Sequence, residues 1–292
     1  MRIGVVHVDS VGVRLLVAVR ENGSLKHVCE EHGSVMLRGE AARSDAIPEP
    51  AMREAARRAR HYVRLAHLLG CGSIEVAVAS PARRSADGAL ARLLGEATGL
   101  PVRLLRPEDE GLLAYAGAGL ALRRAPRSLV VCHVGGDSTQ IVLGTPESGP
   151  MWWRNVELGT LTPTARSLAQ DPPRRRDLAA AQLSVRRTLA GFAPPLPEVA
   201  LAAGSTARAL GRLAGEELGR EELAWALRRL HERRAGALVR RLGLEREQLP
   251  ALTSGALILA ELQRRLGLPL RVAQSGVSEG AALELLAELE AA

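Results

Sequence analysis

Two stretches of the sequence place backbone amides and hydroxyls between apolar runs, and these groups can surround a phosphate. Residues 131–144 read VCHVGGDSTQIVLG, in which Gly135 and Gly136 offer amides and Ser138 and Thr139 offer hydroxyls. The same glycines also suit an ordinary β-hairpin, since tight hairpins need residues that accept positive φ angles. Both interpretations predict an antiparallel hairpin, and the first adds an anion to its turn.

The same arrangement occurs near the N-terminus, in residues 3–19, IGVVHVDSVGVRLLVAV. Each copy has a histidine at the end of its first strand, then a valine, and an Asp-Ser pair in the turn: His7, Val8, Asp9 and Ser10 in the first, and His133, Val134, Asp137 and Ser138 in the second. Two related strand-turn-strand units predict two related domains that hold a phosphorylated ligand across a cleft. The predicted phosphate-binding residues of the turns are Ser10, Gly12, Gly135, Gly136, Asp137, Ser138 and Thr139.

The elements that must position these turns alternate between strands and helices, which predicts an α/β protein. Strands are expected to about residue 45, and the apolar spacing predicts a helix from Pro50 to about Leu69. Another helix begins at Pro107 and carries Glu110 in its first turn. A second series of strands and helices starts just before residue 131. We therefore expect an N-terminal domain at 1–125 and a C-terminal domain with helical additions at 126–292.

Composition narrows the class of protein. With 292 residues and 47% hydrophobic residues, the chain can bury two cores. No run approaches the ~18 apolar residues of a membrane span, and the three cysteines form no CxxC, so we expect a reduced, cytoplasmic protein without a membrane partner. Aromatic residues make up 2% of the chain, which argues against nucleic-acid binding by base stacking. A homodimer is compatible with the sequence.

The formal charge is +7, and nearly all cations are arginines. Arginine suits a polyanionic ligand because a guanidinium binds phosphate in a bidentate manner. The arginine content also accompanies a general richness in alanine and leucine, and arginine runs often lie on solvated helix faces. The charge by itself therefore leaves the ligand open.

An ordered series of segments resembles the exopolyphosphatase and guanosine pentaphosphate phosphohydrolase (Ppx/GppA) family over nearly the whole chain. The segments are MRIGVVHVDSVGVRLLV and VVCHVGGDSTQIVLG, similar to its two phosphate loops; VAVASPARR, similar to its ATSAxR segment; LLRPEDEGLLAYAG, similar to the segment of its catalytic glutamate; and then VELGTLTPT, ALAAGSTARAL, SGALILAELQRRLG and VAQSGVSEGAALELL. The length resembles that of short family members, which have two catalytic domains.

The resemblance implies two actin-like ATPase (ribonuclease H-like) domains with an interdomain cleft. It also implies magnesium-dependent release of the terminal phosphate from polyphosphate or guanosine pentaphosphate. Glu110 falls at the family's catalytic glutamate and Arg83 at its phosphate-contacting arginine. Two alternatives stay open: Glu110 could complement the positive end of its helix together with Glu108 and Asp109, and Arg83 could be an exposed loop cation.

The loops depart from the family pattern where carboxylates organise magnesium. The first loop of the family reads Asp-x-Gly-Ser-Asn-Ser, and here its aspartate position holds His7. The second reads Asp-x-Gly-Gly-Gly-Ser-Thr-Glu, and its first and last positions hold His133 and Gln140. Because magnesium prefers oxygen ligands, we expect a dismantled magnesium site and weakened hydrolysis.

Three interpretations of His7 and His133 remain open. They are structural; or they form an anion pocket that works without metal and gains charge as the pH falls through ~6.5; or they hold a transition ion such as zinc or manganese together with Asp9, Asp137 and Glu110. Two hypotheses for the whole chain follow. It is either a weakened phosphohydrolase or a non-catalytic sensor of the same fold that binds polyphosphate or a nucleotide; a scaffold without any ligand is a third.

Overall fold

The structure is a computed structural model, and it describes residues 1–21, 24–37, 47–79, 88–120, 122, 124–162, 167, 168, 170, 173–192, 194, 196–232, 238, 240, 242, 243 and 248–291. These residues form two compact units. Unit 1 comprises Met1–Leu120 and Ser275–Ala292, and unit 2 comprises Ala121–Gln274. This division differs from the expected ranges 1–125 and 126–292, because the last helix packs into the first unit.

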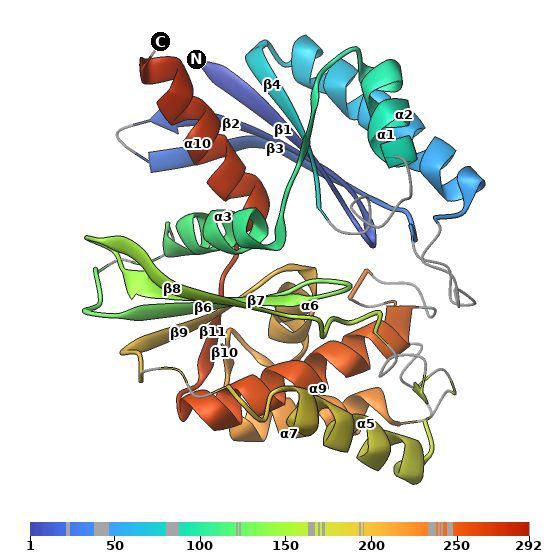
Figure 1. Cartoon of the computed structure of the whole chain (residues 1–292), viewed down its shortest axis with the longest axis vertical. Helices are drawn as coiled ribbons and strands as arrows, with labels where there is room; N and C mark the ends of the chain where they lie inside the picture. The colour runs from blue at the N-terminus through green and yellow to red at the C-terminus, as the bar shows by residue number, and fades with distance from the viewer. Residues whose placement is uncertain are drawn as a thin grey trace. The chain divides into compact units, whose positions relative to one another are not determined.

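Unit 1 contains a five-stranded mixed sheet of order β3-β2-β1-β4-β5 (Figure 1). Its strands are β1 (Arg2–Asp9), β2 (Gly12–Glu21), β3 (Ser24–Ser34), β4 (Cys71–Val78) and β5 (Val102–Leu104). The first three pair antiparallel, while β1, β4 and β5 run parallel, so the carboxyl ends of β1, β4 and β5 share one edge of the sheet.

Both faces of this sheet are covered by helices, as the apolar sequences of β1 and β4 require. One face packs against α1 (Glu49–Leu68) and α2 (Ala89–Thr98), through a cluster that includes Val6 and Val8. The other face packs against α3 (Pro107–Gly119) and α10 (Val277–Ala291), through a cluster that includes Ile3 and Val5. Successive residues of β1 therefore point to opposite helical layers.

Helices α3 and α10 contact each other through their backbones. A Cβ atom added to Gly117 would overlap the backbone of Gly276, and one added to Gly280 would overlap the backbone of Leu113. Glycine is required at both places because a larger residue would separate the helices. This close contact explains why the C-terminal helix belongs to unit 1.

Unit 2 contains a six-stranded mixed sheet of order β10-β11-β9-β6-β7-β8. Its strands are β6 (Leu129–Val134), β7 (Thr139–Thr145), β8 (Gly149–Val156), β9 (Val199–Ala203), β10 (Glu217–Leu218) and β11 (Leu270–Val272). Its helices are α5 (Arg175–Thr188), α6 (Ser205–Ala214), α7 (Arg220–Leu230) and α9 (Leu249–Leu266). Strands β6, β9 and β11 run parallel, and β6, β7 and β8 pair antiparallel.

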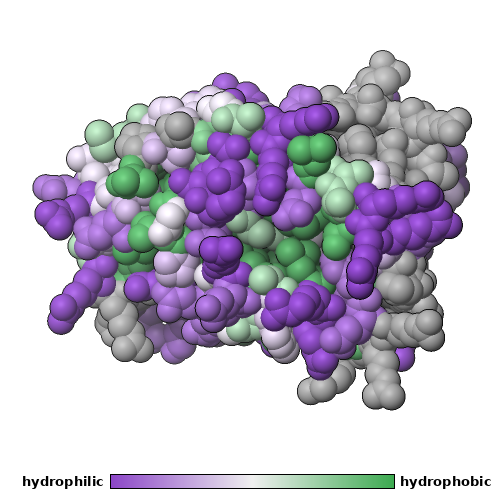
Figure 2. Space-filling view, turned by 90° about the horizontal axis from the view of Figure 1, so that it is seen from below, coloured by the Kyte–Doolittle hydropathy of each residue, from purple (hydrophilic) through white to green (hydrophobic). Residues whose placement is uncertain are grey.

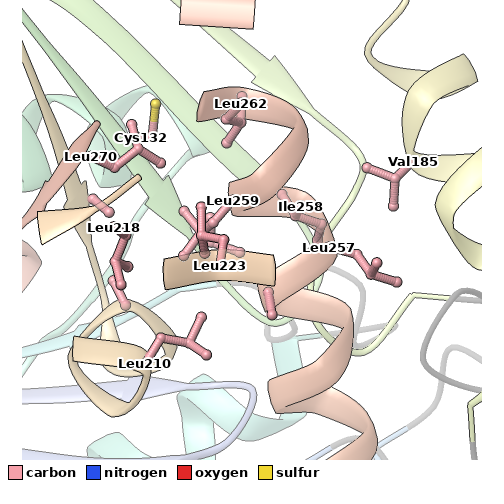
Figure 3. Packing of buried hydrophobic residues seen from close by; sticks show 14 of the residues in the cluster. Cys132, Val185, Leu210, Leu218, Leu223, Leu257, Ile258, Leu259, Leu262 and Leu270 are labelled. Atoms are coloured by element: carbon pink, nitrogen blue, oxygen red, sulfur yellow. The ribbon is translucent and has the colours of Figure 1, made fainter. Parts of the chain in front are cut away.

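The core of unit 2 lies between this sheet and its helices. Figure 3 shows Cys132 of β6 and Leu270 of β11 beside Leu259 and Leu262 of α9, with Leu223 of α7 close by. Each unit thus combines an antiparallel hairpin with parallel strands and helices, which confirms the α/β class. Among the described helices, none is both long and apolar enough to cross a membrane.

Candidate functional site

The predicted second phosphate turn joins β6 to β7 and is held by hydrogen bonds to a later segment of the chain. The Gly135 amide donates to the Ser138 carbonyl at 2.9 Å, which closes the turn. The amides of Thr160 and Leu161 donate to the carbonyls of Gly135 and Gly136 at 3.0 and 2.7 Å. The carbonyls of this turn are therefore bonded to residues 160 and 161.

Gly159 is the residue that permits this close approach. A Cβ atom at Gly159 would overlap the carbonyl of Gly136, so a larger side chain would push the two segments apart. Among the described residues, the amides of Gly136 and Ser138 have no hydrogen-bond partner. Backbone amides without partners are the groups that bind an oxyanion in such a turn.

The N-terminus of α6 lies beside the same turn. Strand β9 runs parallel to β6 with Ala203 opposite His133, and Gly204 follows with a φ angle of 106°, a conformation that favours glycine. A Cβ atom at Gly204 would lie 3.4 Å from the His133 ring, so the ring packs against the start of the helix. The N-cap residue of α6 is Gly204, which offers no side chain to cap the helix. Its first amides and the positive end of its dipole thus attract anions beside this turn.

The hydroxyls of the second turn have different partners. Gln140 Nε2 donates to Ser138 Oγ at 2.8 Å and to Asn155 Oδ1 at 3.0 Å. Because Ser138 Oγ accepts this bond, its own O–H can donate to a ligand. Thr139, which is fully buried, donates its hydroxyl to the Leu158 carbonyl at 2.5 Å. Ser138 therefore suits an anion, whereas the Thr139 hydroxyl is used to hold the fold.

The predicted first turn, between β1 and β2, is closed by its own aspartate. Asp9 Oδ1 accepts hydrogen bonds from the amides of Val11 and Gly12 at 2.8 and 2.9 Å. Burial raises the pKa of Asp9, but Arg14, His7 and the Val11 amide together bring it below its usual value. The ionised carboxylate thus occupies amides that an anion would need. Gly12 is required by packing, since a Cβ there would lie 2.7 Å from the Gly33 carbonyl.

A row of ionisable side chains crosses the sheet of unit 1 beside this turn. His7 lies opposite Arg14 on β2, and Arg14 lies opposite His32 on β3. His7 shares its face of β1 with Ile3 and Val5, so it points to the layer of α3 and α10. Burial lowers the pKa of His7 to about 4, with Asp9 opposing and Arg14 adding to the shift.

The charge state of His7 corrects one expectation from the sequence. A histidine with a pKa of about 4 is neutral at pH 7 and does not gain its proton near pH 6.5. Its Nε2 atom has no hydrogen-bond partner among the described residues. His7 is therefore not a cationic anchor for phosphate near neutral pH; the permanent charge of this row belongs to Arg14.

Glu110 lies in the first turn of α3 and is buried, with 6% of its surface exposed. The helix follows β5, so it begins at the edge of the sheet that carries the β1–β2 turn. Asp109, not Glu110, caps the helix: its Oδ2 accepts the Arg106 amide at 2.8 Å. The capping hydrogen bond of this turn thus comes from Asp109, while the alternative that Glu108, Asp109 and Glu110 complement the positive end of the helix stays open.

The remaining site predictions are distributed between the units. Ser10 is buried in unit 1, and Asp137, also buried, belongs to the second turn in unit 2. Arg83 lies in 80–87, outside the described residues, so its role stays a prediction. Sequence reasoning gave Arg14 and His32 no role at the site, and it identified the α6 N-terminus only as part of the family-like segment ALAAGSTARAL. The first two could have been found from the register of the hairpin, since a two-residue turn after Asp9 places Arg14 opposite His7.

The residues present do not fit the magnesium site that the family resemblance implies. Among the described side chains, no group of three or more His, Cys, Asp or Glu is arranged to hold a metal ion. The family's aspartate position holds the neutral ring of His7, Asp9 is bonded to its own turn, and Gln140 donates its amide to Ser138. The zinc or manganese site of His7, His133, Asp9, Asp137 and Glu110 stays a prediction.

Comparison with known proteins identifies the family to which this sequence is similar. A model of the Ppx/GppA phosphatase family matches residues 16–289. An uncharacterized protein of Streptomyces coelicolor is 28% identical over 231 residues, which cover 75% of this chain and 67% of that protein.

Solved structures agree in fold. An exopolyphosphatase from Cytophaga hutchinsonii is 16% identical, with a TM-score of 0.88, over 99% of this chain and 98% of its own. The Aquifex aeolicus Ppx/GppA family member is 19% identical, with a TM-score of 0.82, over 99% and 98%. Their actin-like ATPase architecture of two domains is thus the fold of this chain, as the sequence predicted.

Proposed function

Since the chain belongs to the Ppx/GppA phosphatase family, we propose that it releases the terminal phosphate from polyphosphate or guanosine pentaphosphate by slow hydrolysis. Family membership supports a phosphohydrolase-type function in general; the substrate and the low rate are our proposal. The observation that carries it is the second turn, where the amides of Gly136 and Ser138 lie beside the N-terminus of α6.

Each residue has a distinct role in this proposal. The amides of Gly136 and Ser138 and the Ser138 hydroxyl bind the phosphate oxygens, and the His133 ring packs against the start of α6. Glu110 accepts a proton from the attacking water, since a buried carboxylate can act as a general base. Arg83 stabilises the charge that develops on the transferred phosphoryl group.

The rate is expected to be low because the carboxylates that would organise a metal are missing. Loss of a group that stabilises transition-state charge typically costs ~10²-fold or more in rate. Neutral His7 and the bonded Asp9 offer no replacement within unit 1. Phosphate binding, in contrast, uses amides and a helix N-terminus, which need no metal.

That contrast favours a second candidate function. A protein that keeps an anion turn but has lost its carboxylates can serve as a non-catalytic sensor of polyphosphate or a guanine nucleotide. The supporting observation is that the first turn satisfies its own amides through Asp9, whereas the second turn does not satisfy those of Gly136 and Ser138. A cytoplasmic location and a homodimer remain predictions for either function.

Phosphate release by purified protein distinguishes the two functions. We would measure release from polyphosphate and from guanosine pentaphosphate, with magnesium and with chelator, together with tripolyphosphate binding by calorimetry. Glu110→Gln should lower release ~10²-fold and leave binding unchanged, because it removes the base and keeps the shape. Glu108→Gln, on the same helical turn, is the matched control and should leave both unchanged.

The outcomes are separable. Binding without release by the unaltered protein would favour the sensor, and no binding of either ligand would reject both functions. Restoring both aspartates, His7→Asp with His133→Asp, should raise release in magnesium. Rapid magnesium-dependent release by the unaltered protein that falls after this double change would contradict the proposed loss of rate.

A further inference from the structure

The positive charge of the chain is concentrated in one unit. Unit 2 carries 23 arginines against 14 acidic residues, a formal charge of +9, whereas unit 1 carries 16 arginines and lysines against 18 acidic residues, a formal charge of −2. General arginine richness would have raised the charge of both units. The excess in unit 2 therefore calls for a local explanation.

Five arginines of unit 2 gather at the C-terminal ends of two helices. This arginine cluster consists of Arg186 and Arg187 in the last turn of α5, Arg264 and Arg265 in the last turn of α9, and Arg154 of β8. Three of them, Arg186, Arg264 and Arg265, share the buried carboxylate of Glu261, which lies 2.7 Å from both Arg264 and Arg265 and 3.8 Å from Arg186. Five cations and one carboxylate leave a formal charge of +4.

Two of the five arginines have a clear structural role. Arg265 donates to the carbonyls of Ala190 and Phe192 at 3.1 and 3.0 Å, and Arg154 donates to that of Gly191 at 2.8 Å. These bonds satisfy carbonyls that follow the end of α5, where positive charge is favourable.

The other three arginines present their charge to solvent. The side chains of Arg186 and Arg264 are 53% and 56% exposed, and Arg187, which follows Arg186 in α5, is exposed as well. Capping one helix does not require them all, and the single carboxylate of Glu261 compensates only one of the positive charges, so the like charges that remain repel one another. The helical face of unit 2 in Figure 2 is largely hydrophilic, around a hydrophobic area.

The position of the cluster within unit 2 indicates the size of its ligand. Helix α9 ends four residues before β11 begins, so the cluster lies toward the amino ends of the parallel strands. The second turn and the N-terminus of α6 lie at their carboxyl ends. Strand β6 has six residues, so the two places are separated by ~20 Å of sheet. A ligand that reaches both must be a chain.

We propose that the arginine cluster is an accessory surface that binds the distal part of a long polyphosphate chain whose terminal phosphate lies at the second turn. This inference rests on the proposed function for the identity of the polymer. Polyphosphate offers a charged tetrahedral group at every unit, which a guanidinium binds through paired N–H donors. Two weak sites on one chain raise its affinity through effective concentration, and a short ligand gains nothing.

The test compares long-chain polyphosphate with tripolyphosphate on one triple variant. In Arg186→Gln/Arg187→Gln/Arg264→Gln, long-chain affinity should fall on the order of tenfold at moderate salt, and the slope of log affinity against log salt should decrease by about 2. Tripolyphosphate affinity should be unchanged. The charge-matched control is Arg57→Gln/Arg60→Gln/Arg64→Gln, three exposed arginines of α1 in unit 1, which should retain long-chain affinity.

A second variant separates binding geometry from charge and from folding. Arg186→Lys/Arg187→Lys/Arg264→Lys keeps the charge and loses the planar fork, so its long-chain affinity should fall less than that of the Arg→Gln triple variant. The proposal would be overturned if the triple variants of α5/α9 and of α1 lost equal long-chain affinity. It would also be overturned if the α5/α9 triple variant lost equal affinity for long-chain polyphosphate and for tripolyphosphate. Tighter binding of single-stranded DNA than of polyphosphate through the same arginines would overturn it as well.

Failure of the proposed function gives a different pattern. If neither tripolyphosphate nor guanosine pentaphosphate binds, but long-chain binding still depends on the cluster, the terminal-phosphate site is wrong and the accessory surface stands. If both short ligands bind and the triple variant changes nothing, the accessory surface is wrong and the proposed function stands.

Discussion

The turn between β1 and β2 bonds its own amides through Asp9, whereas the amides of Gly136 and Ser138 in the turn between β6 and β7 have no partner among the described residues. Both have a histidine, a valine and an Asp-Ser pair in that order. In the first, Asp9 is the last residue of its strand, and its carboxylate accepts the amides two and three residues later. In the second turn, Gly135 and Gly136 come before Asp137, so the aspartate does not precede the glycine amides as Asp9 precedes the amides that it accepts.

This difference teaches that two inserted glycines change what a turn can bind. The short turn satisfies its own amides through a local Asx bond and becomes a rigid structural element. The carbonyls of both turns accept hydrogen bonds from a later segment, from Val35 and Leu37 in the first turn and from Thr160 and Leu161 in the second. The second turn has no carboxylate bond to its amides of the kind that Asp9 makes in the first. Its amides at Gly136 and Ser138 are left for a ligand. We therefore propose that the second turn binds the anion and that the first is structural.

The largest expected effect concerns His7 and the acid sensitivity of the first turn. The folded protein keeps His7 neutral down to a pKa of about 4, whereas the unfolded chain takes up this proton near pH 6.5. At pH values between about 4 and 6.5, the unfolded chain therefore binds a proton on His7 that the folded protein does not. As the pH falls from 7 to about 4.5, this difference should lower the free energy of unfolding by about 2 to 3 kcal/mol. Urea denaturation at both pH values measures this loss.

The variant His7→Gln should lose that part of the pH dependence. Asp9 does not interfere, because its lowered pKa gives stability that is present above the unfolded value and is lost only at lower pH. The exposed His61 of α1, changed to Gln, controls for the loss of a histidine. An unchanged acid sensitivity in His7→Gln would remove the structural assignment of the first turn.

A smaller effect is expected when the support of the second turn is removed. Gly159→Ala places a methyl group against the Gly136 carbonyl, so residues 158–162 must move away from the turn. We expect a loss of about 2 kcal/mol in unfolding free energy, typical of overpacking, and much weaker binding of tripolyphosphate. Urea denaturation and calorimetry measure the two.

The control for this variant is Gly119→Ala. A Cβ atom at Gly119 meets nothing within 4 Å, and the residue lies in α3, where alanine is the better helix former. It should leave stability and binding the same or slightly raise stability. If Gly159→Ala binds tripolyphosphate as well as the control does, the second turn does not depend on its support.

The sequence was sufficient for the features that local patterns determine. The two hairpins, the helix that begins at Pro107 and the α/β class follow from apolar spacing and turn residues. The sequence was insufficient where tertiary contacts decide. The return of α10 to unit 1 depends on glycines at 117 and 280 that are far apart in the chain. The pKa of His7 depends on its burial beneath α3 and α10, which no local pattern reveals.

The smallest expected effect compares the two serines that the sequence treated as equivalent. Ser138 Oγ accepts a hydrogen bond from Gln140, which orients its O–H toward a ligand, so Ser138→Ala should weaken tripolyphosphate binding about tenfold, as for one charge-assisted hydrogen bond. Ser10 lies in a turn whose amides at Val11 and Gly12 are already bonded to Asp9, so Ser10→Ala should change the affinity less than twofold. Calorimetry on both variants, with urea denaturation to exclude a folding defect, measures the ratio of the two losses in affinity.

Equal losses of affinity in Ser138→Ala and Ser10→Ala would mean that both turns bind the anion, and the assignment of binding to the second turn alone would be wrong. A larger loss in Ser10→Ala would reverse that assignment, because the turn that satisfies its own amides would then contribute more to the ligand than the turn that does not.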